Sequence, residues 1–304
     1  MKLAGIITAM VTPLDDKGNI CKERTAGLVN KLINEGVSGL FILGTNGEFF
    51  SFTDDEKVEY SKWVVELADG RVPVYAGSGG IPTNQVIELS NRLAEVGVSA
   101  VSIITPFLIS LTDDELLNHY QIIAKNVNLP IILYNIPANT KINLSKEVVA
   151  ELAKLDKIIG IKDSSGDLEN LQGYLDVAKN EAFSVLVGSD SKILPALKMG
   201  ATGAVAATSN VLTKTDVGIY QNYQDNNLEK AEELQKSIDT FRMANKLGSV
   251  PSMLKYALSI IGYEVGAARL PVMPVNDHEK LAQMQEALKS YQEIENFGGY
   301  YAKN

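Results

Sequence analysis

Short runs of consecutive apolar residues recur along the first two thirds of the chain, and amphipathic stretches separate one run from the next. Unbroken apolar runs are typical of strands covered on both faces, whereas half-exposed strands alternate apolar and polar residues. We expect eight such strands, at residues 6–11, 39–43, 72–76, 100–105, 130–134, 157–162, 183–187 and 203–207. Strands and helices that alternate with a period of about 28 residues predict a (β/α)8 TIM barrel.

Local signals mark where several of the helices begin and end. Gly36 and Gly97 follow amphipathic stretches, at the point where a helix end favours a left-handed residue. The segment at Gly36 recurs at Gly97 and, more loosely, at Gly200, so the repeated unit is a helix, a glycine and a buried strand. The tetrapeptides that start at Thr53 and Thr112 have the Thr-x-x-Glu form of a capping box, which predicts the beginning of a helix.

The strand pattern stops near residue 225, and the rest of the chain has helical patterns at residues 228–241 and 281–291. We therefore predict a catalytic barrel over residues 1–225 and a C-terminal helical extension over residues 226–304. The rival α/β architecture, the doubly wound dinucleotide-binding fold, needs G-x-G-x-x-G after its first strand. Residues 12–19 lack that motif.

Composition narrows the class of protein and its partners. Lys and Arg number 28 against 37 Asp and Glu, so the formal net charge of −9 argues against a nucleic-acid surface. Cys21 is the single cysteine, so no internal disulfide can form. The apolar start at residues 3–11 is too short for a signal sequence, and no apolar run approaches the roughly 20 residues of a membrane helix. We expect a cytoplasmic protein without nucleic-acid or membrane partners.

Two strand ends carry candidate chemistry, because barrel enzymes place catalytic side chains at the carboxyl ends of their strands. The sixth predicted strand ends at Lys162 and the fifth at Tyr134. A lone lysine there is usually solvated, and a lone tyrosine usually borders the core. As neighbours they favour imine chemistry, since an apolar mouth favours the neutral, nucleophilic amine and a phenol can move the protons.

A third candidate is the turn of residues 44–48, Gly-Thr-Asn-Gly-Glu, directly after the second predicted strand. Its two glycines let backbone N–H groups converge on one anion, and Thr45 and Asn46 add side-chain donors. Such turns are often only structural. At the mouth of a barrel, this one is a candidate carboxylate site.

Metal catalysis is not expected of this chain. It has two histidines, His119 and His278, and neither has a second histidine at ligand spacing. A G-x-S-x-G nucleophile elbow is also absent from the sequence.

Four motifs lie at the ends of the second, fifth, sixth and seventh predicted strands. They are Gly44-Thr45-Asn46-Gly47-Glu48, Tyr134-Asn135-Ile136-Pro137, Gly160-Ile161-Lys162-Asp163 and Gly188-Ser189-Asp190. In this order and spacing, they resemble the dihydrodipicolinate synthase / N-acetylneuraminate lyase family of pyruvate-dependent class I aldolases. The resemblance extends over nearly the whole chain, including the helical extension.

The resemblance implies three catalytic roles. Lys162 matches the lysine that forms a Schiff base with pyruvate or another 2-oxo acid, and Tyr134 matches the tyrosine that shuttles protons. Thr45 matches the first hydroxyl residue of the loop that binds the pyruvate carboxylate. The resemblance also implies no cofactor beyond this lysine and a homotetramer built as a dimer of dimers. The implied substrate-binding positions are Thr45, Asn46, Gly47, Leu108, Asn139, Gly188 and Val205.

Three positions depart from the pattern of the synthases. The carboxylate loop normally has two adjacent hydroxyl residues, and the second is here Asn46. Leu108 stands where the synthases offer a tyrosine across the dimer interface. Asn139 replaces an arginine that grips the second substrate's carboxylate, and a neutral amide suits a hydroxylated, uncharged tail better than a second carboxylate.

These observations lead to one main hypothesis and two alternatives. The main one is a Schiff-base lyase that cleaves or forms a 2-keto-3-deoxy sugar acid, with pyruvate and an aldehyde as the other reactants. The first alternative is dihydrodipicolinate (4-hydroxy-tetrahydrodipicolinate) synthase, which condenses pyruvate with aspartate semialdehyde. The second is a catalytically silent homologue that binds small molecules, which intact Lys162 and Tyr134 disfavour.

Overall fold

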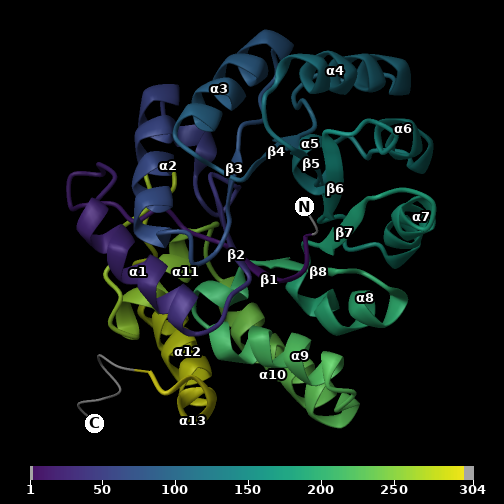
Figure 1. The fold of residues 1–304 in the computed structure, drawn as a ribbon. Coiled ribbons are helices and arrows are strands. Elements are labelled where there is room, and N and C mark those ends of the chain that lie inside the picture. The colour runs from purple at the N-terminus through teal and green to yellow at the C-terminus, as the bar shows by residue number, and fades with distance from the viewer. Residues whose placement is uncertain (1–2, 298–304) are drawn as a thin grey trace.

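Eight parallel strands close into a barrel in the order β1 to β8, and helices surround it (Figure 1). The structure is a computed structural model that describes residues 3–297. The strands are β1 (Gly5–Ala9), β2 (Gly39–Ile42), β3 (Val74–Gly77), β4 (Ala100–Ile104), β5 (Ile131–Asn135), β6 (Ile158–Asp163), β7 (Ser184–Val187) and β8 (Gly203–Ala206). The predicted TIM barrel with a helical C-terminal region is confirmed.

Helices follow the strands along the chain, and further helices follow the barrel. They are α1 (Lys22–Asn34), α2 (Asp54–Ala68), α3 (Thr83–Glu95), α4 (Asp113–Asn126), α5 (Pro137–Thr140), α6 (Lys146–Leu152), α7 (Leu168–Ala178), α8 (Ile193–Met199), α9 (Thr213–Gln224), α10 (Leu228–Asn245), α11 (Ser252–Ile260), α12 (His278–Lys289) and α13 (Gln292–Glu295). Thr53 and Thr112 form the predicted capping boxes of α2 and α4. Gly36 and Gly97 adopt the expected left-handed conformation. Across residues 3–297, no helix is long and apolar enough to cross a membrane.

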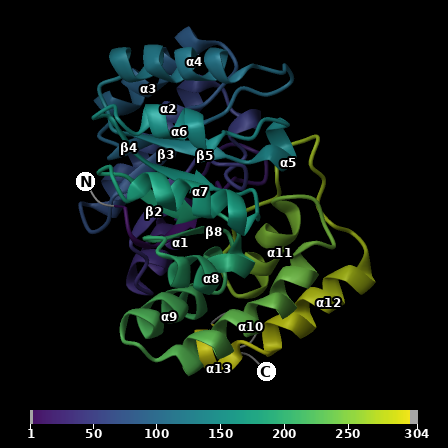
Figure 2. The same cartoon turned by 90° about the vertical axis from the view of Figure 1, so that its right-hand side faces the viewer.

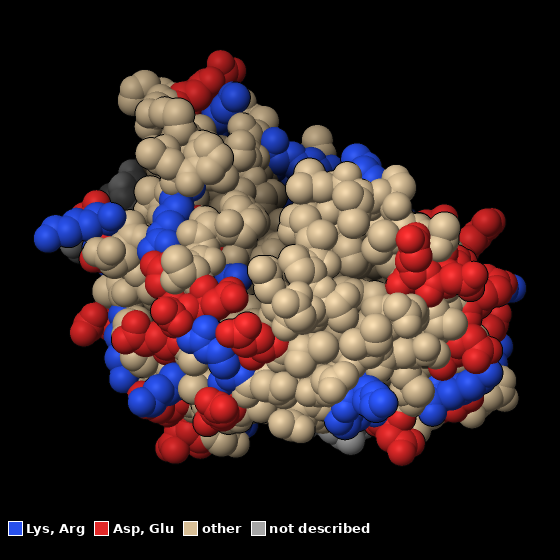
Figure 3. All heavy atoms as spheres, turned by 90° about the horizontal axis from the view of Figure 1, so that it is seen from above, with Lys and Arg blue, Asp and Glu red and all other residues tan. Residues whose placement is uncertain are grey.

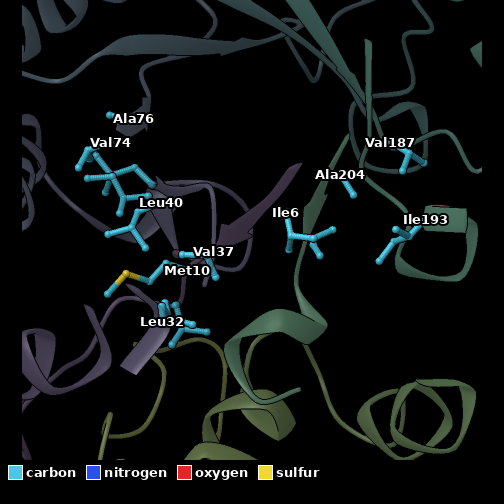
Figure 4. Packing of buried hydrophobic residues seen from close by; sticks show 14 of the residues in the cluster. Ile6, Met10, Leu32, Val37, Leu40, Val74, Ala76, Val187, Ile193 and Ala204 are labelled. Carbon is cyan, nitrogen blue, oxygen red and sulfur yellow. The ribbon is translucent and has the colours of Figure 1, made fainter. Parts of the chain in front are cut away.

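Two separate cores hold the barrel together. The larger one fills the space between strands and helices, where the register partners Leu40 of β2 and Val74 of β3 belong to the same cluster as Leu32 of α1, and Met10 and Val37 lie between them (Figure 4). The smaller one fills the inside of the barrel with Leu3, Ile7, Ala9, Phe41, Tyr75, Ala100, Ile132, Ile159, Leu186 and Val205. Because both faces of each strand are covered, the strands are continuous apolar runs.

The C-terminal helices pack on one side of the barrel, next to α8 and α9 (Figure 2). Helix α10 contacts α8, α9 and α12, and α11 contacts α10 and α12. The predicted domain boundary at residue 225 falls between the end of α9 and the start of α10. Because the core runs through both parts, the extension is packed on the barrel rather than joined to it by a linker.

Arg269 joins the extension to the start of α2. Its guanidinium donates to both carboxylate oxygens of Glu56, at 2.5 and 3.1 Å, and to the carbonyls of Gly18 and Ser51. Glu56 also caps α2 by accepting from the backbone N–H of Thr53 at 2.8 Å. These hydrogen bonds, the ones from Arg269 first, lower the pKa of Glu56 to about 2.

Replacing Glu56 with glutamine should therefore destabilise the protein in a pH-dependent way. A lowered carboxyl pKa adds stability above the unfolded pKa of about 4.3, and this stability is lost as the pH falls toward 2. Because Glu56 is partly exposed, we expect E56Q to lower the free energy of unfolding at pH 7 by roughly 1–2 kcal/mol. Urea titrations from pH 7 to pH 3 should show this difference shrinking. The exposed Glu59 of the same helix is the control, and an equal loss in E59Q would contradict the assignment.

Candidate active site

Lys162 and Tyr134 lie side by side at the carboxyl ends of two neighbouring strands. Strands β5 and β6 are parallel, and Tyr134 is the register partner of Lys162. The lysine Nζ lies 4.2 Å from the centre of the tyrosine ring. Both residues are buried, with exposed fractions of 4% for Lys162 and 5% for Tyr134. The structure thus brings the two predicted catalytic residues into direct contact.

Phe41 of β2 completes the surroundings of the amine. The Lys162 Nζ lies 4.5 Å from the centre of the Phe41 ring, which meets the Tyr134 ring edge-on at 6.3 Å and 77°. The amine is therefore held between two aromatic rings, with little access to water. The sequence marks Phe41 only as one residue of a buried strand, so nothing in the pattern singles it out.

The turn of residues 44–48 reaches the same site from β2. The Thr45 hydroxyl lies 3.5 Å from the Tyr134 hydroxyl, within hydrogen-bond range. Thr45 and Asn46 face the cavity described below. Gly47 is buried behind them, and its carbonyl accepts a hydrogen bond from the Thr12 hydroxyl at 2.7 Å. The turn thus presents two polar side chains to the cavity, and the Thr12 hydroxyl helps to hold its backbone in place.

A cavity of about 260 Å³ opens above the lysine. Its walls are Ala9, Thr45, Asn46, Tyr134, Ile136, Asn139, Lys162, Ser164, Gly188, Ser189, Val205, Ala207 and Val250. Seven of the residues expected from the sequence are among them: Thr45, Asn46, Tyr134, Asn139, Lys162, Gly188 and Val205. Val250 belongs to the extension, which therefore supplies one wall of the site.

Two of the expected substrate-binding residues lie outside the lining of this cavity. Leu108 follows β4 with a φ of +74°, and 89% of its surface is exposed. Gly47 lies within the turn of residues 44–48, and a Cβ there would come within 2.9 Å of the Leu43 nitrogen and 3.1 Å of the Met10 oxygen. Gly47 thus allows close backbone packing beneath the turn. Leu108 is not among the residues that line the cavity.

Gly188 leaves the space that the lysine side chain occupies. A Cβ at this position would lie 2.0 Å from the Ser164 Oγ and 3.0 Å from the Lys162 Cε. The Gly188 N–H donates to the Asp163 carbonyl at 2.6 Å, which links the end of β7 to the end of β6. Any side chain at residue 188 would therefore displace Ser164 or Lys162.

Asp163 holds the ends of β5 and β6 together below the cavity. Its carboxylate accepts from the Asn135 amide at 3.0 Å, the Ser165 hydroxyl at 2.8 Å and the Asn170 amide at 3.3 Å. Burial raises the pKa of Asp163, and these hydrogen bonds oppose that effect. Since Asn135 and Asp163 are also register partners, the network fixes the pairing that brings Tyr134 to Lys162.

Asp190, the third residue of the Gly-Ser-Asp motif, holds the backbone directly after β8, where Ala207 lines the cavity. Its carboxylate accepts the backbone N–H groups of Ala207 and Thr208 at 3.0 and 3.2 Å. These residues follow β8 directly, so the aspartate fixes the backbone beyond Val205. The motif therefore has a structural explanation that does not require contact between Asp190 and a substrate.

No group of three or more His, Cys, Asp or Glu suited to a metal ion occurs among the described residues. His119 packs between α3 and α4, where its Nδ1 lies 2.8 Å from the Thr83 hydroxyl. Burial lowers the pKa of His119 to about 4, so the ring is neutral at physiological pH. His119 is a packing residue and is not among the residues that line the cavity.

Comparison with known proteins decides the family. A family model described as the dihydrodipicolinate synthetase family matches residues 2–291. The chain belongs to this family. It is 36% identical to the 4-hydroxy-tetrahydrodipicolinate synthase of Listeria innocua, over 95% of this chain and 99% of the relative. Enzymes of the family are pyruvate-dependent class I aldolases that use a lysine Schiff base and no external cofactor.

Solved structures of the dihydrodipicolinate synthetase family superpose on nearly the whole chain. The dihydrodipicolinate synthase of Bacillus anthracis has a TM-score of 0.92 and 33% identity, and covers 95% of this chain and 99% of its own. YagE, a prophage protein of Escherichia coli K12 in the dihydrodipicolinic acid synthase family, was solved in complex with pyruvate. Its TM-score is 0.91 at 29% identity, with the same coverage.

Proposed function

We propose that Lys162 is the nucleophile of this enzyme and attacks the keto carbon of pyruvate. The observation that carries the proposal is the burial of its amine between the Tyr134 and Phe41 rings, at the mouth of a closed barrel. Attack by the neutral amine gives a carbinolamine, and loss of water then gives the imine. The Tyr134 ring lies 4.2 Å from the nitrogen and its hydroxyl lies 3.5 Å from the Thr45 hydroxyl, so we propose that this phenol carries the protons that these steps move.

The turn of residues 44–48 is proposed to hold the carboxylate of the 2-oxo acid. Thr45 and Asn46 line the cavity beside the lysine, and the glycine-rich backbone offers N–H groups at the same place. With the imine in place, loss of a C3 proton gives an enamine, whose carbon attacks the aldehyde and forms the C–C bond. Water then hydrolyses the new imine, releases the product and restores the amine. Cleavage is the same sequence in reverse.

For the second reactant we propose an uncharged, hydroxylated aldehyde, so that the product or substrate is a 2-keto-3-deoxy sugar acid. Lys162 is the only Lys or Arg among the described residues that line the cavity, and its nitrogen is already bonded to pyruvate when the aldehyde arrives. A second carboxylate would therefore lack a cationic partner, and Asn139 at the rim offers only a neutral amide. Hydroxyl groups can use such an amide.

The second candidate is condensation of pyruvate with aspartate semialdehyde. The relative from Listeria innocua carries the name 4-hydroxy-tetrahydrodipicolinate synthase, and this similarity over nearly the full chain supports the second candidate better than the first. The chemistry of the cavity wall supports the first. Both candidates use Lys162, and they require the residues around the cavity to recognise different aldehydes.

Substituting Asn139 with arginine should separate the two candidates. We expect wild-type enzyme to release pyruvate from 2-keto-3-deoxy acids and to use aspartate semialdehyde poorly. N139R should raise kcat/KM for aspartate semialdehyde about tenfold or more, because a guanidinium can pair with its carboxylate in a bidentate way. Rapid turnover of aspartate semialdehyde by the wild type would reverse the order of the candidates.

The control for N139R is A138R, which adds the same charge next to the cavity but not in its wall. Ala138 is exposed on the same short helix and lies outside the lining of the cavity. A138R should leave the preference between the two aldehydes unchanged. An equal gain in both variants would mean that added charge steers the anion and that residue 139 does not recognise it.

We also propose that the enzyme assembles into a dimer or a dimer of dimers. Phe50, Leu108 and Ile109 are more than half exposed on the loops after β2 and β4, which meet through the rings of Phe49 and Phe107. One face of the molecule has a broad area without charged side chains, with Asp, Glu, Lys and Arg around its margins (Figure 3). Exposed apolar surface of this kind favours association between subunits. Sedimentation equilibrium measures the mass of the assembly and so tests this proposal.

A further inference from the structure

Glu48 is the last residue of the turn of residues 44–48, and its environment there is uncommon for a charged residue. It is fully buried and has a left-handed backbone, with a φ of +56°. Its N–H donates to the Thr45 carbonyl at 3.2 Å, and its own carbonyl accepts from the Ser51 N–H and hydroxyl. The backbone of Glu48 is therefore part of the turn that presents Thr45 to the lysine.

The carboxylate of Glu48 is held entirely by the C-terminal extension. The Lys255 Nζ of α11 lies 2.6 Å from one oxygen, and the backbone N–H of Arg269 donates to the other at 2.8 Å. Exposed fractions are 0% for the Glu48 side chain and 2% for that of Lys255. Lys255 also donates to the Ala267 carbonyl at 3.2 Å. The pair is thus removed from water and spans 207 residues of sequence.

Neither member of the pair lines the cavity above Lys162, so neither touches the substrate there. Burial lowers the pKa of Lys255, and the neighbouring Glu48 opposes this effect, as expected for a desolvated ion pair. A buried carboxylate without its partner is strongly unfavourable. Glu48 must therefore stay where Lys255 meets it, which also fixes the backbone of the turn.

We propose that Glu48 and Lys255 are positioning residues, through which the C-terminal extension sets the carboxylate-binding geometry of the turn of residues 44–48. The inference rests on the proposed imine chemistry at Lys162 and adds to it a role for residues remote from the reacting atoms. The ion pair orients Thr45 and Asn46 toward the carboxylate of the 2-oxo acid. Loss of the pair should therefore weaken recognition of that carboxylate and leave the reactivity of the lysine intact.

Borohydride trapping separates these two properties, because it reduces any imine on Lys162 to a stable secondary amine. We expect E48Q to need at least tenfold more pyruvate than the wild type for half-maximal trapping. Hydroxyacetone, a ketone without a carboxylate, should be trapped at a rate within twofold of the wild-type rate. The double variant E48Q/K255M removes both charges, so no buried charge is left unpaired, and it should show the same two results.

The matched control is another buried lysine in an ion pair. Lys31 of α1 has a side chain only 2% exposed and lies 2.7 Å from Glu35, away from the turn. K31M should lower the free energy of unfolding but leave half-saturation by pyruvate unchanged. A shift in K31M as large as that in E48Q would overturn the inference, because any loss of stability would then have the same effect.

The inference and the proposed function fail in different ways. If wild-type enzyme is trapped by pyruvate and borohydride, and both E48Q and the double variant keep wild-type half-saturation, the positioning role is wrong while the imine chemistry stands. If E48Q and the double variant trap hydroxyacetone as poorly as they trap pyruvate, the ion pair supports the reactivity of the lysine rather than the geometry of the turn. The inference is then also wrong. If wild-type enzyme gives no adduct at all, the proposed function falls and the inference falls with it.

Discussion

Replacing Lys162 with methionine should abolish covalent capture of pyruvate and lower kcat for aldol cleavage by roughly a thousandfold or more. Methionine fills most of the same volume between the Phe41 and Tyr134 rings, so the barrel should fold as before. It has no amine, and therefore no imine can form. Intact-mass measurement after borohydride treatment with pyruvate checks the adduct, and peptide mapping locates it.

The control for K162M is Lys157, immediately before the same strand and at its opposite end. The Lys157 Nζ donates to the Val127 carbonyl at 2.5 Å, remote from the cavity. K157M should form the pyruvate adduct at the wild-type rate. An adduct that persists in K162M would place the Schiff base on another lysine, and the proposed mechanism would fail.

The sequence is sufficient to predict the barrel and the Lys162–Tyr134 pair, for a physical reason. In a parallel barrel, neighbouring strands end on the same rim, so residues that end the fifth and sixth apolar runs must be neighbours. The register of β5 and β6 then places Tyr134 directly beside Lys162. Capping boxes at Thr53 and Thr112 are equally local, because each satisfies backbone donors within its own first turn.

Phe41 could not be singled out in the same way, although its ring packs against the Lys162 amine. In a strand buried on both faces every position is apolar, so alternation gives no sign of which side chains point into the barrel. Residues 39–43 therefore read as one uniform run. Only the closed barrel distinguishes Phe41, which belongs to the interior core, from Leu40, which belongs to the outer one.

The sequence pattern also did not predict helix α11 or the contact made by its Lys255. The pattern marks α10 and α12, but α11 is only nine residues long, and seven of those residues are buried, the polar Ser252 and Lys255 among them. The partner of Lys255 lies more than two hundred residues away, at Glu48. No local signal predicts such a contact, which depends on how the extension packs behind the turn.

Substituting Tyr134 with phenylalanine should lower kcat about a hundredfold to a thousandfold and leave half-saturation by pyruvate within a few-fold of the wild type. Phenylalanine keeps the ring against Lys162 and Phe41 but removes the hydroxyl that lies 3.5 Å from Thr45. Carbinolamine dehydration and C–C cleavage both require a proton at the reacting centre, so both steps should slow. Single-turnover measurement of imine formation and of pyruvate release separates them.

Tyr75 provides the matched control for Y134F. It is a buried tyrosine of β3 inside the same barrel, outside the lining of the cavity, and burial raises its pKa to about 12. Y75F removes a hydroxyl of the same kind from the same core and should leave kcat unchanged. If Y75F and Y134F lose activity equally, the effect comes from packing in the barrel interior. If Y134F keeps full activity, the phenol carries no essential proton, and the Thr45 hydroxyl or a water molecule must do so.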